Sequence, residues 1–290
     1  MKEKIISRVD FKADLPMEFE IVQLAQVYKQ HTVGMTHPHR ADFYHIIWIK
    51  EGSPVHTVDF VPLKLKPNSL LFVSKDTVHI FDRKGNFDGN GILFTESFFC
   101  RTDEDRKYLK NSILFNSLYD VLPIRLKDNS DAFMLLLTQM EIEFKKPRDS
   151  AQEQILKNLL HNFLLLAERE IKIHQKAVSK RGADFELVVH FCELTEERYK
   201  KNKLVSDIAS EMGVTTKKLY NAAIKELGKT PKELIDGRVM LESKRLLAHT
   251  NFSVKEIGFE LGFEETTNFV KFFRKHYGKP PLEFREKYSL

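Results

Sequence analysis

Apolar residues at helical spacing recur twice in the last hundred residues of the chain, and a glycine follows each time. Ile208 and Met212 stand four residues apart directly before Gly213, and the same order returns about fifty residues later and ends at Gly262. A spacing of four puts both apolar side chains on one face of a helix, and glycine suits the left-handed turn that follows. Each place therefore predicts a short helix, a turn and a second helix.

The two places belong to a longer internal repeat. The segment from Val205 to Pro231 resembles the segment from Val254 to Pro281, and one extra residue enters the second copy after its glycine. The matched pairs are Val205/Val254, Ile208/Ile257, Glu211/Glu260, Met212/Leu261, Gly213/Gly262, Val214/Phe263, Leu219/Phe269, Ala222/Phe272, Ala223/Phe273, Gly228/Gly278, Lys229/Lys279 and Pro231/Pro281. Because the apolar positions survive the shift, the repeat predicts two similar folded units.

The two copies differ in the signal that starts their first helix. Ser253 and Glu256 form the pattern of a capping box, in which the two side chains satisfy free amide donors at a helix start. Leu204 occupies the position that matches Ser253, so the first copy lacks this cap. We expect the first unit to be the less sharply defined of the two.

A longer helix is predicted between the two units. Thr230 is a suitable N-cap, Pro231 suits the first helical position, and Glu233 completes a capping pattern. Apolar residues then follow at helical spacing to about His249, which gives a helix of roughly 19 residues and ~28 Å. Successive major grooves on one side of B-DNA lie ~34 Å apart, so such a connector could hold two helices in adjacent grooves.

The second helix of each unit carries side chains suited to DNA. Hydroxyl, amide and phenol groups can contact base edges, and lysines can contact phosphates, although a solvated helix face would use much the same residues. The candidate DNA-binding residues are Thr215, Thr216, Lys217, Lys218, Tyr220 and Asn221 in the first unit, and Glu265, Thr266, Thr267, Asn268, Lys271 and Lys275 in the second.

Composition sets wide limits. The chain has 290 residues, 42% hydrophobic and 30% charged, which is enough for two domains. Its net charge of +5 comes from 46 basic and 41 acidic residues, so charge alone does not indicate nucleic-acid binding. Only Cys100 and Cys192 carry thiols, and no apolar run approaches the ~18 residues of a membrane span. We expect a cytoplasmic protein that does not bind membranes.

The amino-terminal part has a different pattern. Residues 43–49 and 69–73 are aromatic and β-branched runs bounded by Gly52, Pro62 and Pro67, which predicts short strands in a β-barrel or sandwich. From Ser130 to about His174 the spacing becomes helical and predicts two helices. We expect a first domain over residues 1–174, a polar linker over 175–185 and a second domain over 186–290.

The carboxyl-terminal motifs resemble those of the AraC/XylS family of bacterial transcription regulators, over roughly Leu187 to Tyr288. The resemblance rests on Ile208-Ala209, Gly213-Val214, Gly228-Lys229-Thr230-Pro231, Arg238, Leu246-Leu247, the run from Ile257 to Phe263, Phe269, Phe273-Arg274-Lys275 and Gly278. It implies two helix-turn-helix units joined by a linker helix. The chain has Asn221 and Lys271 where the family commonly has arginine, so no family operator sequence is carried over. It has the small Ala222-Ala223 where the family has a bulky pair, which predicts a thinner core and, with the missing cap, a looser first unit.

The region from about Val22 to Phe99 resembles the cupin-type sensor half found ahead of this DNA-binding module, through His37-Pro38-His39, Gly52, Pro67-Asn68-Ser69 and His79-Ile80-Phe81. The resemblance implies a barrel that binds a small organic effector. The candidate ligand-binding residues are His37, His39, Tyr44, Trp48 and His79. Cupin enzymes also use an acid a few residues after the paired histidines, and Phe43 and Tyr44 stand there, so we expect no metal and no cofactor.

The second predicted helix of residues 130–174 carries an apolar stripe wider than one barrel face needs. In the resembled family, helices at this place form the dimer interface, and the alternative is packing in the core. The candidate dimer-interface residues are Ile155, Leu159, Phe163 and Leu166.

These patterns together predict an α+β chain of two domains: a cupin-like β-barrel with flanking helices, then an all-α domain with two helix-turn-helix units joined by a linker helix. We expect a transcription regulator without catalytic residues. Its expected partners are double-stranded promoter DNA, a small effector, a second copy of the chain and, as a further candidate, RNA polymerase.

Three other classes stay open at this point. One is a metal-dependent cupin enzyme with a DNA-binding tail. Another is a repair methyltransferase fused to a similar module, which is disfavoured because Cys100 and Cys192 stand alone without a metal-binding thiolate cluster. The third is a protein-binding scaffold, and the absence of salt-sensitive duplex binding would favour it.

Overall fold

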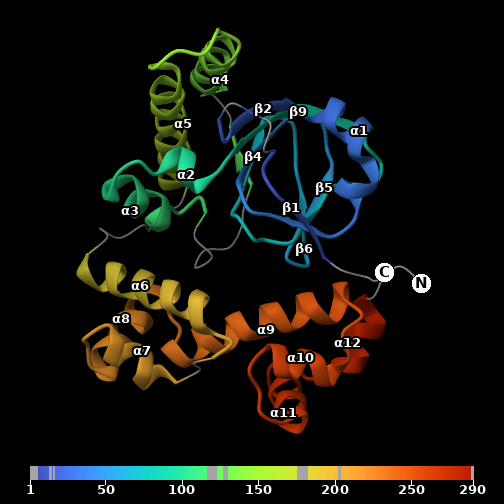
Figure 1. The fold of residues 1–290 in the computed structure, drawn as a ribbon, viewed down its shortest axis with the longest axis vertical. Helices are drawn as coiled ribbons and strands as arrows, with labels where there is room; N and C mark the ends of the chain where they lie inside the picture. The colour runs from blue at the N-terminus through green and yellow to red at the C-terminus, as the bar shows by residue number, and fades with distance from the viewer. Residues whose placement is uncertain are drawn as a thin grey trace. The chain divides into compact units, whose positions relative to one another are not determined.

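The computed structural model describes residues 6–12, 15, 17–115, 123–126, 130–174, 182–201 and 204–288 (Figure 1). They divide into two compact units, one from Ser7 to His174 and the other from Gly182 to Tyr288. The first contains β-sheets with flanking helices and the second is all helical. The predicted fold class, α+β in two domains, is confirmed.

The described strands of the first unit form two five-stranded sheets. The first sheet has the order β1 (Ser7–Val9), β3 (His39–Ala41), β8 (His79–Ile80), β5 (Val55–Val58), β6 (Val61–Lys64). The second has the order β10 (Ile124–Arg125), β7 (Ser69–Val73), β4 (Tyr44–Gly52), β9 (Phe87–Phe94), β2 (Phe19–Gln23). Neighbouring strands are antiparallel except for β1 and β3, and the strands predicted around residues 43–49 and 69–73 are confirmed as β4 and β7.

Strand β4 lies in the middle of the second sheet, and both of its faces are buried because each packs in a separate core cluster. Ile47 and Ile49 join a core cluster that includes Val58 and Leu63 of the first sheet. Tyr44 and Trp48 point the other way and join the cluster that contains the helices at the back of the second sheet. Burial on both faces explains why the sequence here is a continuous apolar run rather than an alternating one.

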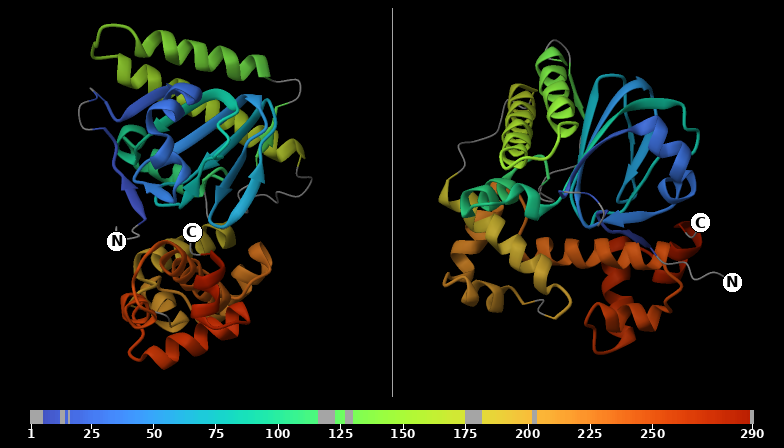
Figure 2. Two further views of the ribbon diagram at one scale, coloured as in Figure 1. Left: turned by 90° about the vertical axis from the view of Figure 1, so that its right-hand side faces the viewer. Right: turned by 45° about the horizontal axis from the view of Figure 1, so that its top comes forward.

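Within the described residues of this unit, the sheets are flanked by the helices α1 (Leu24–Thr36), α2 (Glu96–Phe99), α3 (Asp103–Asn111), α4 (Ser130–Phe144) and α5 (Gln152–His174). Helices α4 and α5 form an antiparallel pair on one side of the sheets, as both views of Figure 2 show. Phe133 and Phe163 of this pair place their rings 4.9 Å apart and 6.4 and 6.3 Å from the Trp48 indole. Edge-to-face aromatic packing therefore fixes the helix pair on β4.

The second unit begins with α6 (Ala183–Arg198). Of the linker expected over residues 175–185, residues 175–181 lie outside the described residues, and the last three residues belong to α6, where Phe185 is buried. The linker prediction is corrected at this end. The helix start is hard to see in the sequence because polar residues and Gly182 make up most of this run.

Six further helices follow: α7 (Val205–Glu211), α8 (Thr216–Leu227), α9 (Pro231–His249), α10 (Val254–Glu260), α11 (Thr266–Tyr277) and α12 (Pro281–Tyr288). The connector predicted from Pro231 to about His249 is confirmed as α9, with the Thr230–Glu233 capping box at its start. The two repeated units lie at opposite ends of α9 (Figure 1). Within the part of the chain that the structure describes, no helix is long and apolar enough to cross a membrane.

Candidate nucleic-acid interface

Each repeated unit is a helix, a glycine turn and a second helix, as the sequence predicts. Gly213 between α7 and α8 has a φ of 65°, and Gly262 between α10 and α11 has a φ of 71°. Both angles lie in the left-handed region that glycine adopts without a steric cost. The turn aims α8 and α11 away from the helices that precede them, which exposes one face of each.

The caps follow the sequence as well. The Ser253 side chain accepts a hydrogen bond from the backbone N–H of Glu256, and the Glu256 carboxylate accepts one from the N–H of Ser253. Leu204 gives α7 no such bond. The predicted difference between the two helix starts is confirmed.

Helices α8 and α11 bury one side and expose the other. Leu219, Ala222 and Ala223 are buried on α8, and Phe269 and Phe273 are buried on α11. The sequence-predicted contact residues lie on the remaining surface: Thr215, Thr216, Lys217, Lys218, Tyr220, Asn221, Glu265, Thr267, Asn268, Lys271 and Lys275 are exposed, and Thr266 is half-buried. Tyr220 keeps 48% of its surface exposed, so an aromatic ring lies beside the polar groups.

Five exposed cations on these two helices form no ion pair with another described residue. They are Lys217, Lys218, Lys271, Arg274 and Lys275. By contrast, Lys225 near the end of α8 pairs with Asp184 at 2.5 Å, and Lys232 of α9 pairs with Asp236 at 2.8 Å. Cations without an acidic partner are available for phosphate, and they cluster on the helices that the turns expose.

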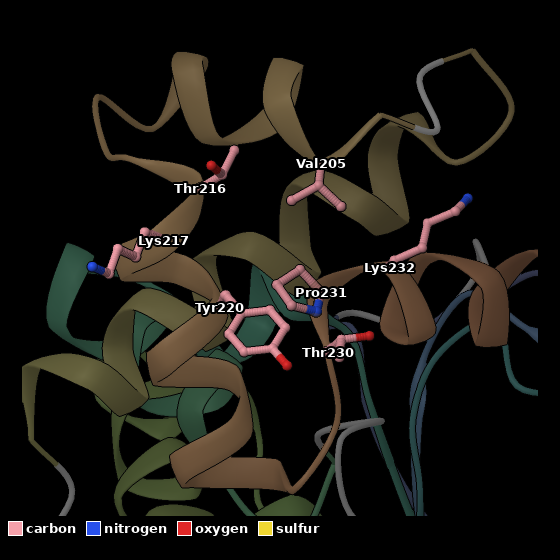
Figure 3. Close-up of a pocket in the computed structure, with 7 residues that line it drawn as sticks. All are labelled: Val205, Thr216, Lys217, Tyr220, Thr230, Pro231 and Lys232. Carbon is pink, nitrogen blue, oxygen red and sulfur yellow. The ribbon is translucent and has the colours of Figure 1, made fainter.

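A shallow hollow of about 480 Å³ lies between α8 and the start of α9 (Figure 3). Thr216, Lys217 and Tyr220 line it from α8, and Pro231 and Lys232 line it from α9. Figure 3 shows Tyr220 beside Pro231, with the two lysines on opposite sides. Thr230 and Lys232 also line the hollow, although the sequence pattern of their segment indicates only the start of the connector.

The amino-terminal unit does not bring the five predicted ligand residues together. His39 and His79 are in contact, with ring centroids 4.3 Å apart. His37 is exposed, and its Nδ1 lies 2.7 Å from the carbonyl oxygen of Val33 in its own helix. Tyr44 and Trp48 lie on the face of β4 that packs on the helices. The expectation of one pocket lined by all five residues is therefore corrected.

Two histidines outside the predicted set, His45 and His56, lie beside His39 and His79. The His45 ring centroid lies 4.8 Å from that of His79, and Nε2 of His56 lies 3.2 Å from Nδ1 of His79. Strands β3, β5 and β8 of the first sheet and β4 of the second each contribute one histidine, so the cluster lies between the sheets. In sequence, the alternation of His45 with Ile47 and Ile49 is the signal that could have found this orientation.

The four histidines, called here the histidine cluster, are buried and held neutral. Burial, followed by the neighbouring imidazoles, lowers the pKa of His45 to about 3 and lowers that of His79 well below its usual value. Burial and His39 lower the pKa of His56 to about 3. Nδ1 of His45 and Nε2 of His79 have no hydrogen-bond partner among the described residues. These two nitrogens are therefore buried hydrogen-bonding groups without a described partner.

No group of three or more His, Cys, Asp or Glu side chains in the described ranges is arranged to hold a metal ion. His37, which the enzyme alternative requires as a ligand, points away from His39 and His79. The carboxylate position of the cupin enzymes is taken by Phe43 and Tyr44, both of them buried. The described residues therefore do not fit the metal site of that alternative.

The candidate dimer residues on α5 differ in exposure. Ile155 is 39% exposed, and Leu159 and Leu166 are half-buried against the core. Phe163 is fully buried beside Trp48 and Phe133, so it is corrected from an interface residue to a core residue. The wide apolar stripe of α5 thus serves the core of its own unit over much of its width.

Known proteins share the helix-turn-helix features of the carboxyl-terminal domain. A family model described as a helix-turn-helix domain matches residues 208–287. The transcriptional activator RhaS of Escherichia coli is 20% identical over 256 residues, covering 86% of this chain and 87% of RhaS. RhaS of Escherichia fergusonii is 18% identical over 253 residues, with the same two coverages.

Solved structures are similar to the chain as well. ToxT from Vibrio cholerae has a TM-score of 0.43 and 16% identity, covering 93% of this chain and 98% of ToxT. A transcriptional regulator with an AraC-type DNA-binding domain from Chromobacterium violaceum has a TM-score of 0.33 and 24% identity, covering 35% of this chain and 91% of that one.

The matched residues contain both glycine turns, both exposed helices and the α9 connector. The relatives that align over most of the chain are transcriptional activators. Residues 208–287 are therefore a helix-turn-helix domain of the AraC/XylS type, and the similarity to transcriptional activators over 86% of the chain supports a DNA-binding transcription regulator.

Proposed function

We propose that this chain binds promoter DNA in a sequence-specific way, with α8 and α11 in successive major grooves, under the control of a small effector that binds its amino-terminal unit. The observation that carries the DNA half is the pair of exposed helices, each with unpaired cations, at the two ends of one helix. We expect this DNA binding to take place in the cytoplasm. It requires no catalytic residue.

The length of α9 supports the spacing. Its 19 residues span about 28 Å, and recognition helices displaced from its ends can approach the ~34 Å between successive grooves on one side of a duplex. Lys217, Lys271 and Lys275 then contact phosphates, and Asn221 reads a base edge, for which adenine is the natural partner of an amide.

The histidine cluster supports the effector half. A small organic molecule with a hydrogen-bonding group would contact Nδ1 of His45 and Nε2 of His79, which have no other described partner. Its effect on DNA binding requires different affinities in two states of the protein. The chain acts as a dimer through the exposed part of α5, with Ile155 in contact and Leu159 and Leu166 at its edge, and RNA polymerase is a partner at the promoter.

Selection of bound duplexes from random DNA tests the DNA half. The protein should return a site with two half-sites about one helical turn apart, and hydroxyl-radical footprints should fall on one side of the duplex. Affinity should fall steeply with salt, because phosphate contacts release counterions. Binding with no salt dependence, or a selected site with a single half-site, would contradict this reading.

A thermal-shift screen against small organic acids, sugars and aromatics tests the effector half. A true effector should raise the unfolding temperature of the amino-terminal unit and change the affinity for the selected duplex. His79→Phe should abolish the shift, whereas His37→Phe, an exposed histidine outside the cluster, should keep it. Equal loss in both variants would place the effector outside the histidine cluster.

A further inference from the structure

The turn of the second unit touches a segment that lies far from it in the sequence. A Cβ atom placed on Gly262 would lie 1.6 Å from the backbone oxygen of Lys200 and 2.8 Å from its carbonyl carbon. No side chain fits there, so the Lys200 carbonyl packs directly on the Gly262 backbone. Lys200 comes just after α6, and its side chain also pairs with Glu260 beside the turn.

The matching turn of the first unit lacks this contact. A Cβ atom placed on Gly213 would meet nothing within 4 Å, although the φ angles of the two glycines, 65° and 71°, are nearly the same. The turn conformation alone therefore explains glycine at 213. At 262, glycine is required twice, by the turn and by the Lys200 carbonyl.

The end of α6, just before Lys200, is held against the connector. The Arg238 guanidinium of α9 stacks on the ring of Tyr199 at 4.0 Å and donates from Nη2 to Oε1 of Glu196 at 2.7 Å. Arg238 also donates to Glu242, which is 4% exposed, at 3.2 Å. The end of α6 is thus fastened to α9 on one side, and Lys200 contacts the turn of the second helix-turn-helix unit on the other.

We propose that Lys200 and Gly262 form a clasp that fixes the second unit relative to α9, and so sets the spacing of DNA half-sites that the protein accepts. The inference rests on the proposed function for its consequence at DNA, but the clasp itself is a property of the free protein. Such a clasp prevents hinge motion between α9 and α10. The Lys200–Glu260 ion pair contributes little to its stability, because both side chains are nearly half exposed.

Gly262→Asn and Gly213→Asn form a matched pair that tests the clasp. Asparagine tolerates the left-handed conformation, so both variants carry a small and similar turn penalty. Only Gly262→Asn places a Cβ against the Lys200 carbonyl. Both variants are made in the full chain, and circular dichroism confirms their helix content.

Distances between spin labels test the clasp without DNA. Labels at Ile224→Cys in α8 and Arg274→Cys in α11, with Cys100 and Cys192 replaced by alanine, should give one narrow distance distribution in the parent protein. Gly262→Asn should shift or broaden it, and Gly213→Asn should leave it unchanged. A broad distribution in the parent overturns the proposal whether or not the Gly262 variant folds, and so does a folded Gly262→Asn with the parent distribution.

Binding to selected duplexes tests the consequence. The parent should lose at least about ten-fold in affinity when one base pair, about 3.4 Å, is inserted between the half-sites, and Gly262→Asn should lose less than about three-fold. Gly213→Asn should keep the parent discrimination. If the parent binds no duplex, the proposed function fails while the label distances still decide the clasp; if Gly262→Asn keeps the discrimination, the clasp does not set the spacing.

Discussion

The two helix-turn-helix units share a backbone and differ in what fills them. In the second unit, Phe269 and Phe273 occupy the buried side of α11, and Phe284 of α12 packs 5.6 Å from Phe273. In the first, Leu219 and two alanines occupy the same side of α8. Helix α6 packs closely on α8, and Val188 and Phe191 of α6 are fully buried.

The small pair Ala222-Ala223 therefore does not leave the first unit empty, because it gives α6 room to approach. The sequence comparison of the two copies predicts a thinner core in the first unit, and this holds only when α6 is left out. A duplicated module can keep its turns and exposed faces while its core is completed from different neighbours. The expectation that the first unit is the looser one stays a prediction, and the following variants sharpen it.

Phe273→Ala should give the largest effect. It removes a fully buried ring that contacts Phe269, Tyr277 and Phe284, and such truncations cost about 3–5 kcal/mol because a cavity remains. Urea unfolding followed by circular dichroism measures the change. The matched Ala223→Gly should cost about 1 kcal/mol, mainly in helix propensity. Similar costs at both positions would mean that the two cores are filled in the same way.

Ala223→Phe should come next. A ring at this fully buried position would collide with α6, and overpacking of this kind costs about 1–3 kcal/mol. Hydrogen exchange should then show lower protection in α6 as well as in α8. Ile224→Phe, at a neighbouring side chain that is 40% exposed, is the control and should change little. Unchanged protection in α6 would argue against its role in completing this core.

The helix caps should give effects of opposite sign in the two units. Ser253→Ala removes a capping box and should destabilise by about 1 kcal/mol. Leu204→Ser, followed by Asp207 at the third position, creates a cap and should stabilise α7 by a few tenths to about 1 kcal/mol. Native-state hydrogen exchange of α7 and α10 measures both. A destabilising Leu204→Ser would show that the Leu204 side chain contributes more than a cap would.

The exposed faces should give the smallest effect on stability. Lys217→Ala and Lys271→Ala should each change the free energy of unfolding by less than about 0.5 kcal/mol, since neither lysine has a described ion pair. Each should lower the slope of affinity against salt by about one, because one phosphate contact is lost. Equal slopes in the two variants would indicate equal engagement of both units. If the salt slope stays unchanged in Lys217→Ala but falls in Lys271→Ala, only the second helix-turn-helix unit contacts phosphate through the lysine tested.

Local signals in the sequence predicted the carboxyl-terminal helical domain well. The limits of α9, the Ser253 cap and both glycine turns depend on residues within one helical turn of each other, so a short segment contains the whole signal. The exposed faces of α8 and α11 follow from the same local periodicity. The start of α6 was missed because the polar run before it resembles a linker.

The amino-terminal unit was harder to predict because its candidate site is formed by strands that are far apart in the sequence. Alternation places Tyr44 and Trp48 on one face of β4, but which face meets the other sheet depends on where α4 and α5 pack. His45 and His56 join His39 and His79 only through pairing between four strands. Phe163 looked like an interface residue because its partners, Trp48 and Phe133, lie in other elements.

The histidine cluster couples the barrel to acidity. The folded-state pKa of each cluster histidine lies below that of the unfolded chain, so the unfolded chain takes up protons first as the pH falls below about 6.5. The stability of this unit therefore falls with pH, and for His45 and His56 the loss continues to about pH 3. Trp48, the only tryptophan of the chain, lies in this unit, and its emission follows the acid transition separately from the helical domain. Acidification would therefore destabilise the unit that contains the histidine cluster, and a loss of Trp48 emission would report its unfolding.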